Sequence, residues 1–165
     1  MKEFLLKDGI IVDGNRNKPY QGSVLIRRGK IHSIITDQVD INDYENVIEV
    51  KGKIIAPGFI DIHSHSDSVD LPPEETQSKL FQGVTTEITG NCGNSSYPKS
   101  VNEGNIQEYL LRKTSDKMPI NHGFLLGHGT LRSRVVGYDD RDASEEELER
   151  MCDYLDRALK GGAFG

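Results

Sequence analysis

Short hydrophobic stretches separated by turn residues fill the first 50 or so positions, and this pattern predicts β-strands. Arg28-Gly29 lies between two of these stretches and indicates a β-hairpin. Lys7-Asp8-Gly9 indicates a further turn. The strands expected in this part of the chain are residues 4–6, 10–12, 23–27, 30–35 and 47–50. We therefore predict a small N-terminal β module over residues 1–53.

The pattern changes after residue 53, because strands then alternate with helices. Residues 54–63 form a nearly continuous hydrophobic run, which is typical of a strand buried on both faces of a parallel sheet. Such alternation predicts a parallel sheet with helical crossovers. Further strands are expected at residues 84–89 and 123–127, and 163–165 would open a fourth. The expected helices cover residues 72–83, 105–119 and 144–160.

The last of these helices has the strongest signal. Ser144 and Glu147 form a capping-box pattern at its start, and Gly161-Gly162 follows its end. Its expected buried stripe comprises Leu148, Met151, Cys152, Leu155 and Leu159. Three strand–helix units end at residue 162, which is too few for the eight units, about 250 residues, of a complete barrel. The second domain, residues 54–165, is thus either a small open sheet or the front part of a larger fold.

Charge and hydropathy exclude several classes of partner. The net charge is −6, with both signs interspersed and no basic stripe, so nucleic acid is not an expected partner. The mean hydropathy is −0.53, and no apolar stretch approaches the roughly 20 residues that cross a bilayer, so no membrane partner is expected. Charges interrupt the first seven residues, which excludes a signal peptide's apolar core. We expect a cytoplasmic protein whose two cysteines are not bridged.

His63-Ser64-His65 is the sharpest chemical feature. It ends the first expected barrel-type strand, and alternate strand positions face the same way, so the two imidazoles could bind one metal ion. Cys92, in Gly90-Asn91-Cys92-Gly93, follows the next strand, and a thiolate there could complete three sides of a zinc site. The plainer interpretations are two surface histidines and a small buried cysteine in a glycine-rich turn.

These residues belong to motifs that resemble the amidohydrolase superfamily. Residues 56–67, APGFIDIHSHSD, are similar to its first-strand metal motif. QGVTT followed by GNCG, residues 82–86 and 90–93, and GHGTLR, residues 127–132, are similar to the D-aminoacylase (N-acyl-D-amino-acid deacylase) branch. Residues 5–14 resemble the small β-sandwich that opens those enzymes. The resemblance covers essentially all of this chain but only about the first third of the family's length.

This resemblance implies a fold class and a metal site. The fold would be α/β: a small N-terminal β-sandwich-like module, then the first three βα units of an incomplete (β/α)8 TIM-type barrel. His63, His65 and Cys92 would be the metal ligands, for zinc or for one or two divalent ions whose identity stays open. A metal-activated water would hydrolyse the amide of a small N-acyl-D-amino acid, releasing a carboxylate and a D-amino acid.

The resemblance also implies that part of the machinery is missing. Two further histidine ligands, the general-base aspartate and the substrate-carboxylate clamp all correspond to positions beyond Gly165. We therefore expect an N-terminal fragment of a metal-dependent hydrolase that is nearly inactive in isolation, with no complete set of catalytic residues.

Other polar residues near the expected site have less specific signals. Asp61 would accept a hydrogen bond from a ligand histidine, whereas Asp67 is expected to be a solvated loop carboxylate. Asn91 either contacts substrate or holds a turn. His128 is expected to share one strand face with His122 and to line the pocket. Arg132, Arg134 and Tyr138 are expected in a loop, either facing an anionic substrate or simply solvated.

Two alternative functions stay open. One is a cyclic amidohydrolase of the hydantoinase or dihydropyrimidinase kind, which also uses a histidine pair but usually a carbamylated lysine in place of the cysteine. The other is a non-catalytic truncated protein that binds a metal or a partner. An exposed sheet edge in such a protein would favour oligomerisation.

Overall fold

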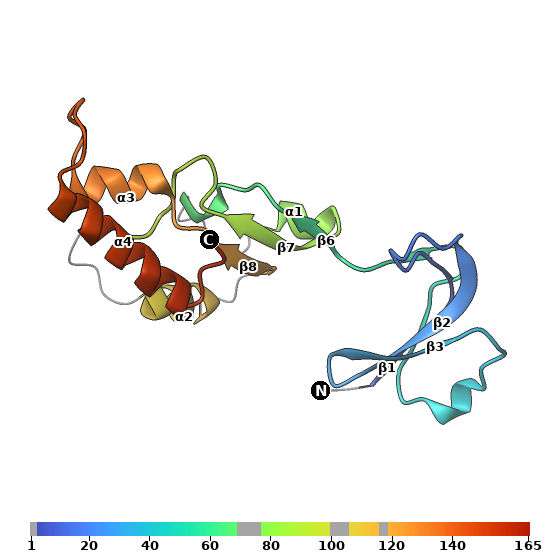
Figure 1. The fold of residues 1–165 in the computed structure, drawn as a ribbon. Coiled ribbons are helices and arrows are strands. Elements are labelled where there is room, and N and C mark those ends of the chain that lie inside the picture. The colour runs from blue at the N-terminus through green and yellow to red at the C-terminus, as the bar shows by residue number, and fades with distance from the viewer. Residues whose placement is uncertain (1–2, 69–76, 100–105, 116–118) are drawn as a thin grey trace. The chain divides into compact units, whose positions relative to one another are not determined.

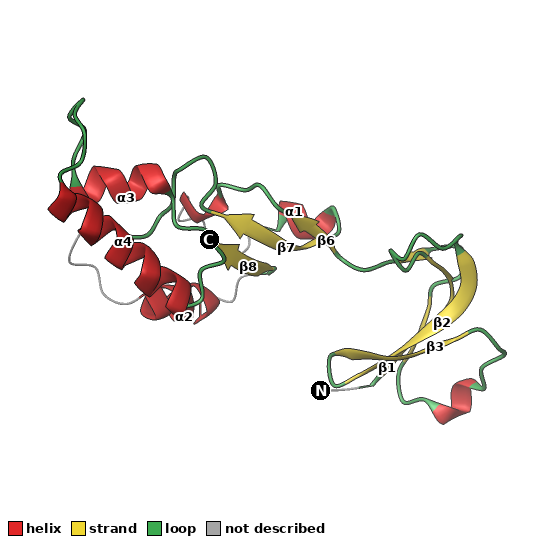
Figure 2. Cartoon of the chain, in the orientation of Figure 1, coloured by secondary structure: helices red, strands yellow, loops and turns green. Residues whose placement is uncertain are grey.

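The computed structural model describes residues 3–68, 77–99, 106–115 and 119–165 (Figure 1). The chain divides into two compact units, residues 1–57 and residues 58–165. Among the described residues, every α-helix lies in the second unit, while the first contains five strands and one short 3-10 helix, Ile41–Asp43 (Figure 2). None of the described helices has the length and apolar content that crossing a bilayer requires.

The first unit is one β-sheet with the strand order β3-β2-β1-β4. β2 runs antiparallel to both β1 and β3, whereas β4 and β5 pair in parallel with β1. Arg28 and Gly29 have φ values of 52° and 73°, as a type I′ hairpin turn requires, so the predicted hairpin is confirmed. The five strands are β1 (Phe4–Ile11), β2 (Tyr20–Arg27), β3 (Lys30–Ile35), β4 (Val47–Glu49) and β5 (Ile54–Ile55).

Two details of the first unit differ from the sequence prediction. Lys7-Asp8-Gly9 does not separate two strands. Asp8 has φ 62° and the pairing register shifts between Leu6 and Gly9, so these residues form a bulge inside β1. The described residues of the first unit form a single sheet rather than a sandwich, because β4 and β5 both pair with β1 instead of starting a second layer.

The hydrophobic run of residues 54–63 is two strands rather than one. β5 (Ile54–Ile55) pairs with β1 in the first unit, and β6 (Phe59–Asp61) pairs with β7 in the second. Nor is β6 buried on both faces, since Phe59 and Ile60 are each 62% exposed. Pro57, which has no N–H to donate, lies between the two strands. Hydropathy could not reveal this division because both strands are apolar.

The second unit contains a parallel sheet with the order β6-β7-β8. β7 (Val84–Thr89) agrees with the prediction, while β8 (Asn121–Phe124) begins two residues earlier than expected. Phe164 N–H donates to the carbonyl of Phe124, and Leu126 N–H donates to the carbonyl of Gly165, so the last residues lie beside β8 as the expected fourth strand would.

The described α-helices of this unit are α1 (Ser78–Phe81), α2 (Ile106–Ser115), α3 (His128–Val135) and α4 (Glu145–Lys160). The predicted helices over residues 72–83 and 105–119 correspond to α1 and α2, but residues 72–76, 105 and 116–118 lie outside the described part of the chain. α3 occupies the region where the sequence predicted a loop. Only Leu131 of α3 is buried, so it lacks the hydrophobic stripe that indicates a helix.

The core of the second unit lies between β8 and the helices α2, α3 and α4, which Figure 1 shows grouped beside that strand. The capping box of Ser144 and Glu147 at the start of α4 is confirmed. The buried face of α4 consists of Met151, Tyr154 and Ala158. Four members of the expected stripe are instead exposed: Leu148, Cys152, Leu155 and Leu159.

Candidate metal centre

Three side chains meet at the carboxyl ends of two neighbouring strands. His63 and His65 lie just after β6, and Cys92 lies just after β7. Their candidate ligand atoms all lie within 4.8 Å of one another, and Nε2 of His63 is 3.1 Å from Sγ of Cys92. All three residues are exposed. The histidines belong to a turn rather than to the strand, because β6 ends at Asp61.

The turn that carries Cys92 depends on its glycines. Gly90, with φ +83°, lies so close to the residue that follows β8 that an added Cβ would be 1.9 Å from the carbonyl oxygen of Leu125. Cys92 itself has φ 55°, a conformation that is uncommon for a residue with a side chain. The Asn91 amide donates to the carbonyls of Ile88 at 2.8 Å and Ser64 at 3.3 Å. Asn91 therefore holds this turn and links it to the histidine turn.

A partly buried ionic network lies directly beside the histidine turn. Glu87, in the middle of β7, is 1% exposed, and its carboxylate pairs with the Lys79 ammonium from α1. The same ammonium lies 2.8 Å from Oδ2 of Asp61 and 2.6 Å from Oγ of Ser64. Sequence reasoning missed Lys79 and Glu87. The available signal was a single acidic residue within an otherwise β-branched strand.

These contacts shift the pKa values of the three charged groups. The hydrogen bond from Lys79 is the main cause that lowers the pKa of Asp61, and the backbone N–H of His63 adds to it. Burial opposes ionisation of Glu87, but hydrogen bonds from Lys79, Ser64 and Ser66 outweigh burial and lower its pKa. Burial likewise opposes the charge on Lys79, yet its two carboxylate partners raise its pKa. All three groups are therefore charged at neutral pH.

The remaining candidate residues lie away from the three possible ligands or have other partners. Asp61 accepts the backbone N–H of His63 at 3.2 Å rather than an imidazole N–H. His128 is exposed as the first residue of α3, so it does not share a strand face with His122, which lies in β8. Asp67 is 5% exposed and accepts the Ser96 N–H at 2.9 Å, so the prediction of a solvated carboxylate is wrong.

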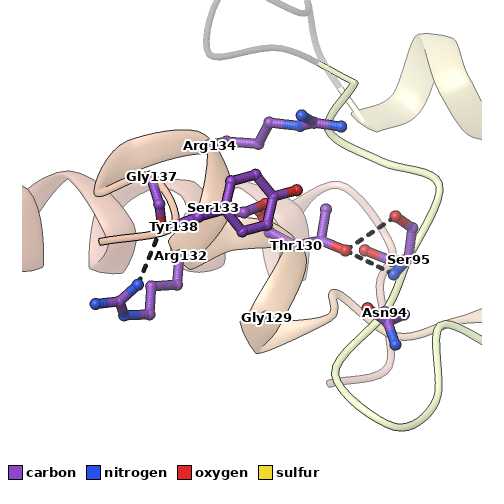
Figure 3. Close-up of a pocket in the computed structure, with 9 residues that line it drawn as sticks. All are labelled: Asn94, Ser95, Gly129, Thr130, Arg132, Ser133, Arg134, Gly137 and Tyr138. Atoms are coloured by element: carbon purple, nitrogen blue, oxygen red, sulfur yellow. Dashed lines mark hydrogen bonds between the residues drawn. The ribbon is translucent and has the colours of Figure 1, made fainter. Parts of the chain in front are cut away.

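A cavity of about 390 Å³ lies beside the residues that follow Cys92 (Figure 3). Thr130 and Ser95 are joined across it by two hydrogen bonds, as the dashed lines in Figure 3 show. The Arg132 guanidinium donates to the carbonyls of Gly137, Asp139 and Arg141, so it stabilises the loop after α3. Arg134 and Tyr138 also line this cavity.

The donor set of the three clustered residues fits a zinc ion. Imidazole nitrogen and thiolate sulfur are the ligands that zinc prefers, at about 2.0–2.1 Å and 2.3 Å respectively. Tetrahedral angles then place ligand atoms roughly 3.3–3.6 Å apart. The 3.1 Å separation of His63 Nε2 and Cys92 Sγ is close to these values, and every pair of candidate atoms in the cluster lies within 4.8 Å. Small side-chain movements would bring all three atoms onto one ion.

Known proteins resemble this chain in sequence. D-aminoacylase of Alcaligenes xylosoxydans xylosoxydans is 34% identical, in an alignment that covers 99% of this chain and 37% of that enzyme. N-acyl-D-aspartate deacylase of the same organism is 32% identical, covering 99% of this chain and 36% of that enzyme. The chain thus spans little more than a third of the length of these relatives.

Solved structures agree with the sequence comparison. A D-aminoacylase studied for its binuclear metal centre has a TM-score of 0.86 and 29% identity, covering 100% of this chain and 38% of that one. N-acyl-D-glutamate deacylase of Bordetella bronchiseptica, solved with zinc and a phosphonate inhibitor, has a TM-score of 0.85 and 28% identity, covering 99% of this chain and 37% of that one.

The hydantoinase alternative has weaker support. L-hydantoinase of Arthrobacter aurescens has a TM-score of 0.57 at 20% identity, covering 75% of this chain and 27% of that one, so the likeness concerns the fold alone. The amidohydrolase family matches this sequence over residues 46–165, which include both turns of the metal centre. With that match, and with its close likeness to D-aminoacylase, the chain belongs to the amidohydrolase family.

Proposed function

We propose that this chain is the N-terminal portion of a zinc-dependent hydrolase that cleaves the amide bond of N-acyl-D-amino acids. The convergence of His63, His65 and Cys92 at one end of the β6–β7 pair is the observation that carries the proposal. The names of the relatives supply the substrate class. The parallel order β6-β7-β8, with helices between the strands, supports the first three units of a (β/α)8 barrel.

The residues of this chain would bind and orient the metal. A bound zinc ion supplies a Lewis acid that polarises an amide carbonyl and acidifies a water molecule. Cys92 binds as a thiolate, and the two histidines bind through neutral imidazoles. The hydrogen bonds from the Asn91 side-chain amide to two backbone carbonyls keep the cysteine turn against the histidine turn. Because the chain spans 37% of its relative's length, we propose that proton transfer and substrate binding need residues outside it.

Direct metal binding tests this proposal. Cobalt(II) is a spectroscopic substitute for zinc, and a thiolate ligand gives it a charge-transfer absorption. We expect this absorption in the wild-type chain, its loss in Cys92→Ser, and competition by zinc. Cys152→Ser is the matched control, because Cys152 is also a free, exposed cysteine but lies in α4. No binding by the wild-type chain, or equal binding by Cys92→Ser, would contradict the proposed site.

Substrate specificity is tested separately, on a longer polypeptide that restores the length of the relatives. We expect hydrolysis of N-acetyl-D-methionine, no hydrolysis of its L-enantiomer, and no ring opening of a hydantoin. The 165-residue chain alone should be nearly inactive even with zinc. Rapid turnover by that chain would show that the 165 residues already contain a sufficient general base.

A further inference from the structure

We propose that Glu87 is a positioning residue for the metal ligands, and that it acts through Ser64 and Ser66 on the turn that carries both histidines. The inference rests on the proposed metal site and concerns how the chain holds that site in shape. Glu87 does not reach the metal ligands itself, since it lies in the middle of β7, buried and beside the turn.

The two serines connect the buried carboxylate to the histidine turn. Ser64 lies between His63 and His65 and is 5% exposed, in contrast to the exposed histidines on either side. Its hydroxyl donates to Oε2 of Glu87 at 2.6 Å. The Ser66 hydroxyl donates to the other oxygen, Oε1. One carboxylate therefore holds the residue before His65 and the residue after it.

Lys79 closes the network around the start of the same turn. Its ammonium binds Glu87, Ser64 and Asp61, which accounts for all three of its N–H donors. Asp61 in turn accepts the backbone N–H of His63. The network therefore reaches the main chain of the first histidine as well as the residues that flank the second.

Neighbouring groups occupy all the acceptor sites of the Glu87 carboxylate. A carboxylate has about four acceptor sites, and Glu87 faces four groups: the hydroxyls of Ser64 and Ser66, the ammonium of Lys79, and Nδ1 of His122 at 3.3 Å. A hydrophobic residue at position 87 would fill the same space but could accept none of these bonds. The adjacent carbonyl of Ile88 accepts both the Ser64 N–H and the Asn91 amide, so β7 holds both ligand turns.

Glu87→Gln tests the role of the carboxylate with little change of volume. One oxygen becomes an NH2 group, so the side chain can no longer accept from both serine hydroxyls. Partners that orient metal ligands typically contribute 10- to 100-fold to metal affinity. We expect cobalt and zinc to bind at least about tenfold more weakly, with an altered cobalt spectrum, because that spectrum reports ligand geometry. Glu146→Gln, at an exposed position of α4, should bind like the wild type.

Ser64→Ala provides a second route, because it removes the link but leaves the Glu87–Lys79 pair. If Glu87 acts through Ser64, the double variant should bind metal more tightly than the product of the two single effects predicts. Circular dichroism and the thermal midpoint verify that each variant folds. If Glu87→Gln does not fold, the metal affinity of Ser64→Ala tests the positioning role by itself.

The outcomes separate this inference from the proposed function. Wild-type affinity, within twofold, in both variants would overturn the positioning role, provided that Cys92→Ser has lost binding. Absence of binding by the wild-type chain would overturn the metal site and this inference with it.

Discussion

Gly90 is the described glycine at which an added Cβ would make the shortest contact, 1.9 Å from the carbonyl oxygen of Leu125. The turn that carries Cys92 therefore needs glycine at this position. Gly90→Ala would require both a strained positive φ and a movement of the backbone at Leu125, just after β8. Gly137→Ala isolates the first effect, because Gly137 has φ +89° and open space around its Cβ position. We expect Gly137→Ala to cost about 1–2 kcal/mol and Gly90→Ala clearly more.

Urea unfolding measures this difference, and cobalt binding by Gly90→Ala should also weaken. Equal losses of stability in the two alanine variants would show that the Leu125 carbonyl can move without cost.

The residues of the site were only partly predictable. The clustering of His63, His65 and Cys92 could be predicted because their positions after two neighbouring strands have the spacing expected of a metal site. Glu87 and Lys79 could not, because an acidic residue in a strand and a lysine in a short helix are usually solvated. The burial of Glu87 and its pairing with Lys79 depend on contacts between segments, which a single sequence does not display. The same reason explains the buried Asp67.

At the scale of elements, the start of α4 predicts a dependence of stability on pH. Hydrogen bonds from Arg141, and then from the Ser144 N–H, lower the pKa of Glu147 from 4.5 to about 2. Because the folded-state pKa is below the ordinary one, this stabilisation is present above pH 4.5 and is lost as the pH falls towards 2.

The difference in unfolding free energy between wild type and Glu147→Gln should therefore shrink between those pH values. Urea titrations at a series of pH values measure it, with exposed Glu146→Gln as the control. A difference that stays constant down to pH 2 would show that the ionised Glu147 does not stabilise the cap.

Helices and strands were predictable where the pattern was local. β7 and the capping box of α4 agree with the prediction because strand propensity and capping depend on adjacent residues. The buried face of α4 does not agree with the prediction, since Tyr154 and Ala158 are buried while Leu155 and Leu159 are exposed. Hydrophobicity alone could not identify the buried face, because partners elsewhere in the chain select it.

At the scale of the whole molecule, zinc should stabilise one unit and leave the other unchanged. At a free concentration about 100 times the Kd, binding adds about 2.7 kcal/mol to the free energy of unfolding. Some amides exchange only when residues 58–165 unfold, and we expect zinc to slow their exchange by up to about 100-fold. Exchange in β1, β2 and β3 should stay the same. A chelator should restore the exchange rates measured without zinc, and in His63→Ala zinc should not slow the exchange.

Mass spectrometry of peptides from the two units distinguishes them within one sample. Slower exchange in the first unit as well would show that zinc couples the stability of the two units.

The pairing of Ile54 and Ile55 with β1 matters for anyone who expresses the two units separately. A gene truncated at codon 54 would remove both residues of β5 and with them the carbonyl of Ile55, which accepts the Val12 N–H, and would leave Lys53, whose carbonyl accepts the Ile10 N–H, as the last residue. Truncation at codon 58 would retain those bonds in the upstream product and would release a downstream product that begins at Gly58, immediately before β6.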